Sequence, residues 1–402
     1  MKSAWAVLAT AVVALFAGIW IGGHPNNLPD GLRDVFVESS ITSGQSASDE
    51  AFEVISDNYF RETDAQRLQD ASISGMVSRL REQYEDRFSH YFDAEQLAQF
   101  NEAIDGSFSG VGMTVGAIEK SGLRIGTVFN RSPADRAGFE SGDVIVSVDG
   151  ESILGEPSDV VVAKIKGPVG SEVTLGIRKG GEGRPQSVTL TREEIRVPVT
   201  GSRVRTVEGR KLGYVRLSTF SDGASVALRR AVNRVLDEGV EGIVLDLRSN
   251  GGGLLPEAVL TSSIFVPEGE VVVETRSRTQ GDETYRALGN SIDPPPMVVL
   301  VNRDTASAAE ILAAALQTTN DDPVVGTRTF GKGVFQQVIK LDNGGALDLT
   351  IGEFLTADGV SLAGEGLKPD VRAPERPDAE RDVQLDRAFG VLGREVTAEP
   401  ES

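Results

Sequence analysis

Ser307 and Lys332 are the two residues whose types and surroundings could support nucleophilic catalysis. Residues 297–301 form a short apolar run typical of a buried strand, and residues 306–316 are rich in Ala, Leu and Ile, which favours a helix. Ser307 would therefore lie where a strand leads into a helix. The first N–H groups of a helix lack intrahelical partners and its dipole is positive there, so an anion is stabilised. This position suits the oxyanion of acyl transfer.

The same serine has a purely structural interpretation. Ser307-Ala-Ala-Glu310 is also a capping box, in which the serine and the glutamate satisfy backbone groups at the start of a helix. The choice between the two roles depends on whether the chain supplies a base.

The base must come from a small set of side chains. The chain contains only two histidines, His24 and His90, and a serine-histidine-acid triad would need His90, which the sequence neither supports nor excludes. A lysine can act as the base if burial lowers its pKa. Lys332 follows Ser307 by 25 residues and lies between two glycines, which let the backbone turn tightly and approach another segment closely.

These two segments resemble the signature of the C-terminal processing (tail-specific) proteases. The matching stretches are Thr305-Ala-Ser307-Ala-Ala-Glu310 and Phe330-Gly-Lys332-Gly. The resemblance implies that Ser307 is the nucleophile, that Lys332 is its base, and that Gln336 positions the lysine. It also implies a crotonase/ClpP-like α/β fold for the protease core.

A glycine loop elsewhere in the chain completes the expected site. Residues 242–247 predict a buried strand, and Arg248-Ser-Asn-Gly-Gly-Gly253 follows it. By itself such a loop could be a flexible turn or a phosphate cradle. The loop resembles a glycine-rich segment of the same family, which implies that the N–H groups of Gly253 and Ala308 form the oxyanion hole.

Residues 106–192 predict a small module of short strands separated by Gly and Asp turns. Ser109-Gly-Val-Gly-Met113 and Ser132-Pro-Ala-Asp-Arg-Ala-Gly138 resemble a PDZ domain of the protease-associated type. Such a domain adds a peptide to the edge of its sheet and holds the free carboxylate on backbone N–H groups. The resemblance assigns that role to Val111, Gly112 and Met113, although their glycines could simply shape a turn.

The N-terminus predicts a membrane segment. Lys2 precedes residues 4–21, whose only polar member is Thr10, and this run is long enough to span a bilayer. A cleaved signal peptide is the alternative, but Trp20 and Ile21 are too large for the small-residue pattern that precedes a cleavage site. We predict an uncleaved single-pass anchor in the cell membrane, with the bulk of the chain extracytoplasmic, in the periplasm or at the cell exterior.

Length and patterning predict a multidomain α/β protein, because 402 residues with 40% hydrophobic content can form several cores. Residues 48–105 carry apolar side chains at helical spacing, and a helix is expected through Arg87-Phe-Ser-His-Tyr-Phe92. We expect residues 193–201 to be a linker and later strands and helices to alternate. The predicted parts are an anchor (1–23), a linker (24–47), a helical segment (48–105), a PDZ-like β module (106–192), the protease core (193–372) and a C-terminal tail (373–402).

The composition limits the classes of molecule that this protein is expected to bind. The net charge of −20, from 60 acidic and 40 basic residues, disfavours nucleic acid. The absence of cysteine and the presence of only two histidines argue against a zinc site, and we expect no metal or cofactor. The expected partners are proteins or peptides with free C-termini and the membrane, with a homo-oligomer or an adaptor left open.

Two functions from different classes fit this sequence. The first is a membrane-anchored serine endopeptidase that recognises protein C-termini, and the second is a catalytically inactive, membrane-tethered PDZ scaffold. A nucleotide-binding protein fits less well: residues 326–333 nearly match a P-loop, but Gly333 lacks the required hydroxyl and a strand is predicted where a helix should follow.

Overall fold

The computed structural model describes residues 42–119, 122–154, 156–376, 379 and 381–397. The chain divides into two compact units, with the boundary between Glu85 and Asp86. The predicted anchor lies outside the described residues, as does most of the predicted linker. Within the described ranges, no helix has both the length and the apolar character needed to cross a bilayer.

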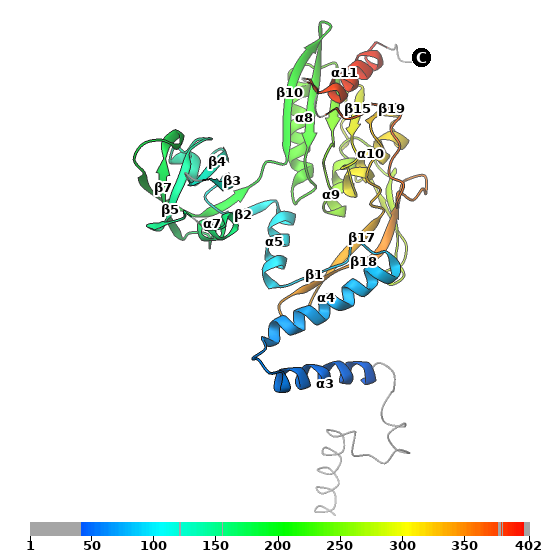
Figure 1. Cartoon of the computed structure of the whole chain (residues 1–402). Coiled ribbons are helices and arrows are strands. Elements are labelled where there is room, and N and C mark those ends of the chain that lie inside the picture. Colours follow the sequence, from blue (N-terminus) through cyan, green and yellow to red (C-terminus); the bar gives the residue numbers. More distant parts are fainter. Residues whose placement is uncertain (1–41, 120–121, 155, 377–378, 380, 398–402) are drawn as a thin grey trace, which may run out of the picture. The chain divides into compact units, whose positions relative to one another are not determined.

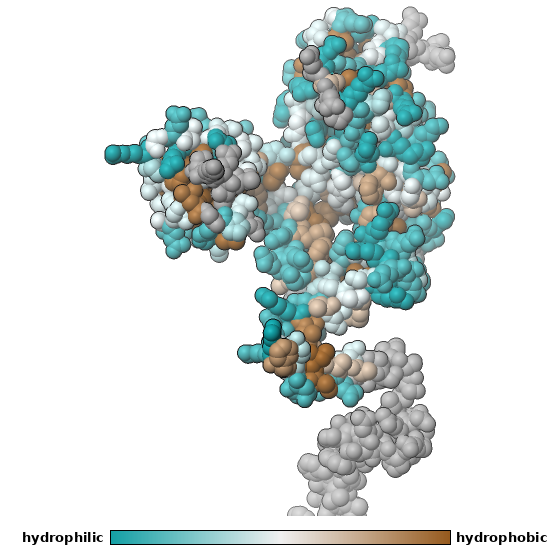
Figure 2. Space-filling view, viewed as in Figure 1, coloured by the Kyte–Doolittle hydropathy of each residue, from teal (hydrophilic) through white to brown (hydrophobic). Residues whose placement is uncertain are grey.

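The first unit is a pair of helices, α3 (Thr42–Asn58) and α4 (Ala65–Tyr84). The Asp64 carboxylate caps α4 by accepting the Arg67 N–H, and Glu85 ends the helix in the left-handed conformation. Helix α3 already covers the end of the predicted linker, because it begins at Thr42. Several large apolar side chains of this unit are exposed, among them Val54 and Phe60. Hydrophobic patches are visible on the surface of this unit in Figure 2.

Helices make up most of residues 48–105, but the prediction of a helix through residues 87–92 is wrong. After α4 the chain forms a turn and then a strand, β1 (His90–Phe92), before helix α5 (Ala94–Asp105). The Asp86 carboxylate accepts the N–H groups of Phe88 and Ser89, which diverts the backbone from a helix. A full capping box at Asp93 then starts α5.

The next module is built on a sheet in the order β3-β4-β5-β7-β8, with β3 at one edge (Figure 1). Its five strands are β3 (Met113–Glu119), β4 (Gly122–Val128), β5 (Val144–Val148), β7 (Glu172–Arg178) and β8 (Gln186–Thr191). The short strand β6 (Glu151–Ser152) pairs with β5. The module also contains helices α6 (Pro133–Arg136) and α7 (Ser158–Ile165) and the short 3₁₀ turn η2 (Lys179–Gly181).

The prediction of a linker at residues 193–201 also needs correction, because part of this segment is a strand. Strand β9 (Glu193–Arg196) pairs antiparallel with β2 (Ser107–Gly110), so the chain enters and leaves this module through one two-stranded ribbon. Ile195 is buried in the pairing. Charged residues flank Ile195 on both sides, and a short strand with a single buried residue gives too little periodicity to be predicted from sequence.

The protease core is organised around a six-stranded sheet with the order β10-β11-β12-β15-β16-β19. All pairs are parallel except β10 with β11. The strands are β10 (Thr200–Val207), β11 (Arg210–Leu217), β12 (Gly242–Asp246), β15 (Met297–Val301), β16 (Val324–Gly326) and β19 (Val371–Arg372). Every residue of β12 and β15 is buried, as expected for parallel strands covered on both faces.

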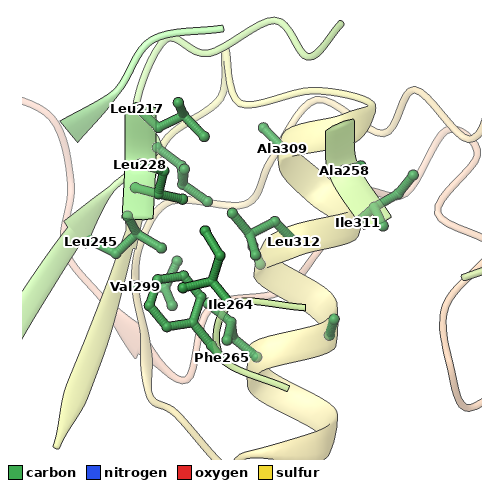
Figure 3. Packing of buried hydrophobic residues seen from close by; sticks show 14 of the residues in the cluster. Leu217, Leu228, Leu245, Ala258, Ile264, Phe265, Val299, Ala309, Ile311 and Leu312 are labelled. Carbon is green, nitrogen blue, oxygen red and sulfur yellow. The ribbon is translucent and has the colours of Figure 1, made fainter. Parts of the chain in front are cut away.

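Helices cover both faces of this sheet. Helices α8 (Ala224–Asp237) and α10 (Ala308–Thr319) cover one face, and Leu228 and Leu312 share one hydrophobic core with strand residues such as Leu245 and Val299 (Figure 3). Helix α9 (Leu255–Ser262) packs against both helices and adds Ala258 to this core. Helix α11 (Val383–Glu395) covers the other face with side chains that include Leu385 and Phe389. The segments that follow β12 and β15 carry predicted site residues, namely Gly253 and Ser307.

A second sheet flanks the catalytic segment. It contains β13 (Val271–Arg276), β14 (Glu283–Arg286), β17 (Val334–Lys340) and β18 (Ala346–Leu355), together with β1. The β17–β18 hairpin turns at the predicted Asp342-Asn-Gly-Gly segment, where Gly344 has a φ of +86°. Strand β1 pairs with the start of β18, so residues 86–92 lie beside the hairpin that follows Lys332.

Candidate active site

Ser307 lies between β15 and α10 in a strained conformation. Its φ is +57° and its ψ is −123°, whereas a helix-capping serine normally has an extended backbone with negative φ. Non-glycine residues with positive φ are uncommon. Such strain persists only where the surrounding structure imposes it, and it concentrates at functional sites. Ser307 is therefore more than an ordinary helix cap.

The buried carboxylate of Glu310 ties the serine segment to the lysine segment. It accepts the backbone N–H groups of Ser307 (2.8 Å), Gly331 (2.8 Å) and Lys332 (3.0 Å), together with the hydroxyl of Thr329. A buried charge is tolerated only when it is this well hydrogen-bonded. The sequence indicated the capping half of this role but not the contacts to residues 329–332, because they are distant in sequence.

The structure brings all five predicted catalytic and oxyanion residues to one cavity. It has a volume of about 660 Å³, and its lining includes Gly253, Ser307, Ala308, Lys332 and Gln336. No histidine is among the lining residues that the structure describes. His90 lies on β1 and is exposed, and His24 lies outside the described ranges. Among the described residues, the cavity that holds Ser307 therefore contains a lysine and no histidine.

The glycine loop after β12 packs directly against Ser307. A Cβ atom on Gly252 would lie 2.8 Å from Ser307 Cβ and 2.9 Å from the Ala306 carbonyl oxygen, so only glycine fits. The Ala306 N–H donates to the Asn250 carbonyl (2.9 Å), which fastens the two segments together. Within the described part of the chain, the N–H groups of Gly253 and Ala308 have no hydrogen-bond acceptor. Both are available to a developing oxyanion.

Lys332 lies just before β17 and is partly buried. Burial lowers the pKa of its amine below the usual value, while the nearby Asp348 carboxylate acts in the opposite direction. Its Nζ also lies 5.2 Å from the centre of the Phe88 ring. Gly333 allows this burial, because a Cβ there would lie 2.4 Å from the Ala363 backbone nitrogen. The sign of the pKa shift is the one a general base requires.

Asp348 is a cavity residue that sequence reasoning missed. Its side chain is buried in β18, and burial raises the pKa of its carboxyl, although Lys332 and His90 oppose that shift. No motif marks it. The hairpin signal combined with the alternation along β18 could have found it, because Asp348 pairs with Val338, two residues beyond Gln336.

The predicted carboxylate-binding residues lie in a different cavity, of about 1040 Å³. Val111, Gly112 and Met113 line it where edge strand β3 faces Val160 and Ala163 of α7. Gly112 has a φ of +83°, and its carbonyl accepts the Phe129 N–H and the Ser132 hydroxyl, which hold the loop in place. An open sheet edge beside a helix is the geometry of peptide capture by strand addition.

Comparison with known proteins decides the family. A model of peptidase family S41 matches residues 211–373, and a PDZ domain model matches residues 124–179. The carboxy-terminal processing protease CtpA of Bacillus subtilis (strain 168) is 34% identical over 390 residues, which are 96% of this chain and 80% of that protein. This chain belongs to the carboxy-terminal processing proteases of peptidase family S41. The predicted family, its serine protease core and its PDZ domain are confirmed.

Two further matches agree with this assignment. The carboxy-terminal processing protease CtpB of the same Bacillus strain is 32% identical over 330 residues, covering 82% of this chain and 68% of that protein. A solved structure of a Bacteroides fragilis NCTC 9343 protein assigned to the S41 proteases aligns with a TM-score of 0.51 at 20% identity. That alignment covers 84% of this chain and 91% of the other and shows a shared fold.

Proposed function

We propose that this chain is a membrane-anchored serine endopeptidase that binds protein C-termini through its PDZ domain and cleaves with Ser307, Lys332 and Gln336. One observation carries the proposal: a strained serine and a partly buried lysine of lowered pKa line the same cavity, and their backbone N–H groups donate to one carboxylate, that of Glu310. An inactive PDZ scaffold would need neither the strain at Ser307 nor the partial burial of Lys332, so the protease is the better-supported hypothesis.

The reaction begins with a proton transfer. Neutral Lys332 takes the proton from Ser307 Oγ as that oxygen attacks the peptide carbonyl carbon. The carbonyl oxygen becomes an oxyanion, which the N–H groups of Gly253 and Ala308 stabilise. The C–N bond then breaks, and the Lys332 ammonium donates its proton to the leaving amine. An acyl-enzyme on Ser307 and the first peptide product result.

Hydrolysis of the acyl-enzyme repeats these steps with water. Lys332 takes a proton from the water as the oxygen attacks the ester carbon, and the same two N–H groups hold the second oxyanion. Collapse releases the new carboxylic acid and returns the proton to Ser307. Gln336 is suited to orient the amine throughout, because a neutral amide adds no charge that would raise the lysine pKa.

The direct test is an assay of the purified protein on an unfolded protein substrate, with the products identified by mass spectrometry. A protease should release peptides in a time-dependent reaction. The scaffold alternative predicts binding without any cleavage. Stable substrate in the presence of well-folded protein would refute the proposed activity.

The proposed PDZ role gives a second prediction. Amidating the C-terminus of a test peptide removes the carboxylate, so it should weaken binding by about tenfold or more, the value of a charge-assisted hydrogen bond. Binding is measured by fluorescence anisotropy on the full chain carrying Ser307→Ala, which prevents cleavage. Acetylating the peptide N-terminus is the matched control and should leave the affinity unchanged. Equal affinity for the acid and the amide would remove the carboxylate-binding role from Gly112 and its neighbours.

The cellular location follows from the run at residues 4–21 and is part of the same proposal. We expect the full chain to fractionate with membranes and a version lacking residues 1–23 to be released from them. A reporter fused after Ser402 should be active on the extracytoplasmic side, because the early positive charge lies on the short N-terminal side. Cytoplasmic reporter activity would overturn the topology, and N-terminal sequencing distinguishes an anchor from a cleaved signal peptide.

A further inference from the structure

The turn before β1 reaches the catalytic cavity through a chain of hydrogen bonds. Besides holding the N–H groups of Phe88 and Ser89, the Asp86 carboxylate accepts the hydroxyl proton of Thr350 on β18 (3.1 Å). The Ser89 hydroxyl in turn accepts the Thr350 backbone N–H (3.0 Å). The turn is thereby fixed to β18 at one residue.

Thr350 extends this connection to Gln336. The two residues are register partners in the β17–β18 hairpin, and Gln336 Nε2 donates to Thr350 Oγ1 (3.3 Å). A carboxylate can only accept hydrogen bonds, and a hydroxyl has only one proton to donate. Because Thr350 gives that proton to Asp86, its oxygen can only accept from Gln336. The Gln336 amide therefore turns its nitrogen toward Thr350.

The direction of this amide matters to the neighbouring base. A neutral lysine amine has two N–H groups and one lone pair, and the lone pair must be left for the proton of Ser307. With its nitrogen held by Thr350, Gln336 keeps its Oε1 as an acceptor for a lysine N–H. A reversed amide would present N–H groups instead, and these would compete with Ser307 for the lone pair.

We propose that Asp86 and Thr350 are positioning residues that fix the direction of the Gln336 amide and thereby keep the lone pair of Lys332 available to Ser307. The inference rests on the roles proposed above for Lys332 and Gln336. It gives a function to the Asp86–Ser89 turn, which also places the Phe88 ring near the lysine amine.

The charge state of Asp86 supports this arrangement. Burial alone would raise the pKa of the Asp86 carboxyl, but hydrogen bonds from Ser89, Phe88 and Thr350 outweigh it and hold that pKa below the usual value. Asp86 therefore remains ionised, and hence a pure acceptor, at neutral and mildly acidic pH.

The test uses Thr350→Val, which keeps the shape and the β-branching of the side chain but removes the hydroxyl. We expect kcat to fall about tenfold, the equivalent of about 1.4 kcal/mol, with KM unchanged. Thr350→Ser retains the hydroxyl and should stay close to the wild-type rate. Thr284→Val, an exposed threonine of β14 in the same sheet, is the matched control and should have no effect.

Coupling to Gln336 separates positioning from a general structural role. In a Gln336→Ala background no amide remains for Asp86 and Thr350 to orient, so Thr350→Val should cause no further loss of kcat. Asp86→Asn frees the hydroxyl to point either way, and its effect should not add to that of Thr350→Val. A wild-type kcat in Thr350→Val, or an equal loss with and without Gln336, would overturn the inference. Activity surviving in Ser307→Ala or Lys332→Arg would instead refute the proposed mechanism.

Discussion

Replacing Ser307 with alanine is expected to lower kcat on an unfolded protein by about 10⁴-fold or more, because no other group takes over the nucleophile's role. The fold should be kept, since the change removes one oxygen atom. Binding of a C-terminal peptide should also be kept, because Val111, Gly112 and Met113 line a separate cavity. Activity and peptide affinity are measured on the same preparation.

Ser307→Gly supplies an informative companion. Glycine adopts a φ of +57° without the penalty that a Cβ atom brings, whereas alanine keeps that penalty. Both variants should be inactive, and the glycine variant should be the more stable by about 1 kcal/mol in its free energy of unfolding. Denaturant titration measures this difference. Retained cleavage by either variant would show that the nucleophile lies elsewhere.

Lys332→Arg should lower kcat by a factor of about 10³ to 10⁴, because arginine keeps the positive charge but does not give up its proton in a protein. Its longer, similarly charged side chain tests proton transfer more directly than truncation does. The His90→Ala variant is the control, and it should retain normal turnover because His90 is exposed and does not line the cavity. Near-normal activity of Lys332→Arg, or loss of activity in a folded His90→Ala variant, would exclude the Ser-Lys assignment.

The pH dependence of kcat/KM reports the same lysine in the wild type. The base must be neutral, so the rate should rise with pH as Lys332 loses its proton and level off above its pKa. Burial lowers the pKa of Lys332, so this rise should occur below the usual lysine range. Removing the negative charge in Asp348→Asn destabilises the ammonium further and should move the rise to still lower pH. If kcat/KM rises at the same pH in both proteins, the Asp348 charge does not affect the pKa of Lys332.

The parts of the candidate site that the sequence alone determined depend only on residues close together in the chain. The apolar run at residues 297–301, the helix that follows it and the glycines around Lys332 each depend on residues within a few positions, and the structure places a strand, a helix and a tight approach there. The capping signal at Ser307 is local in the same way, and half of it is formed by the Glu310 carboxylate. Short-range patterns succeed because backbone conformation and side-chain periodicity are set by near neighbours.

Tertiary structure alone decided the remaining parts of the site. The sequence around residues 90–92 predicts a helix, but these residues form a strand because they pair with β18, more than 250 residues away. Thr350 and Asp348 belong to no motif and become relevant only when the hairpin faces Lys332 and the Asp86 turn. The Glu310 carboxylate reaches Thr329, Gly331 and Lys332 only after α10 has packed on the sheet. Such contacts depend on how buried faces of distant segments are brought together, and no window of sequence contains that information.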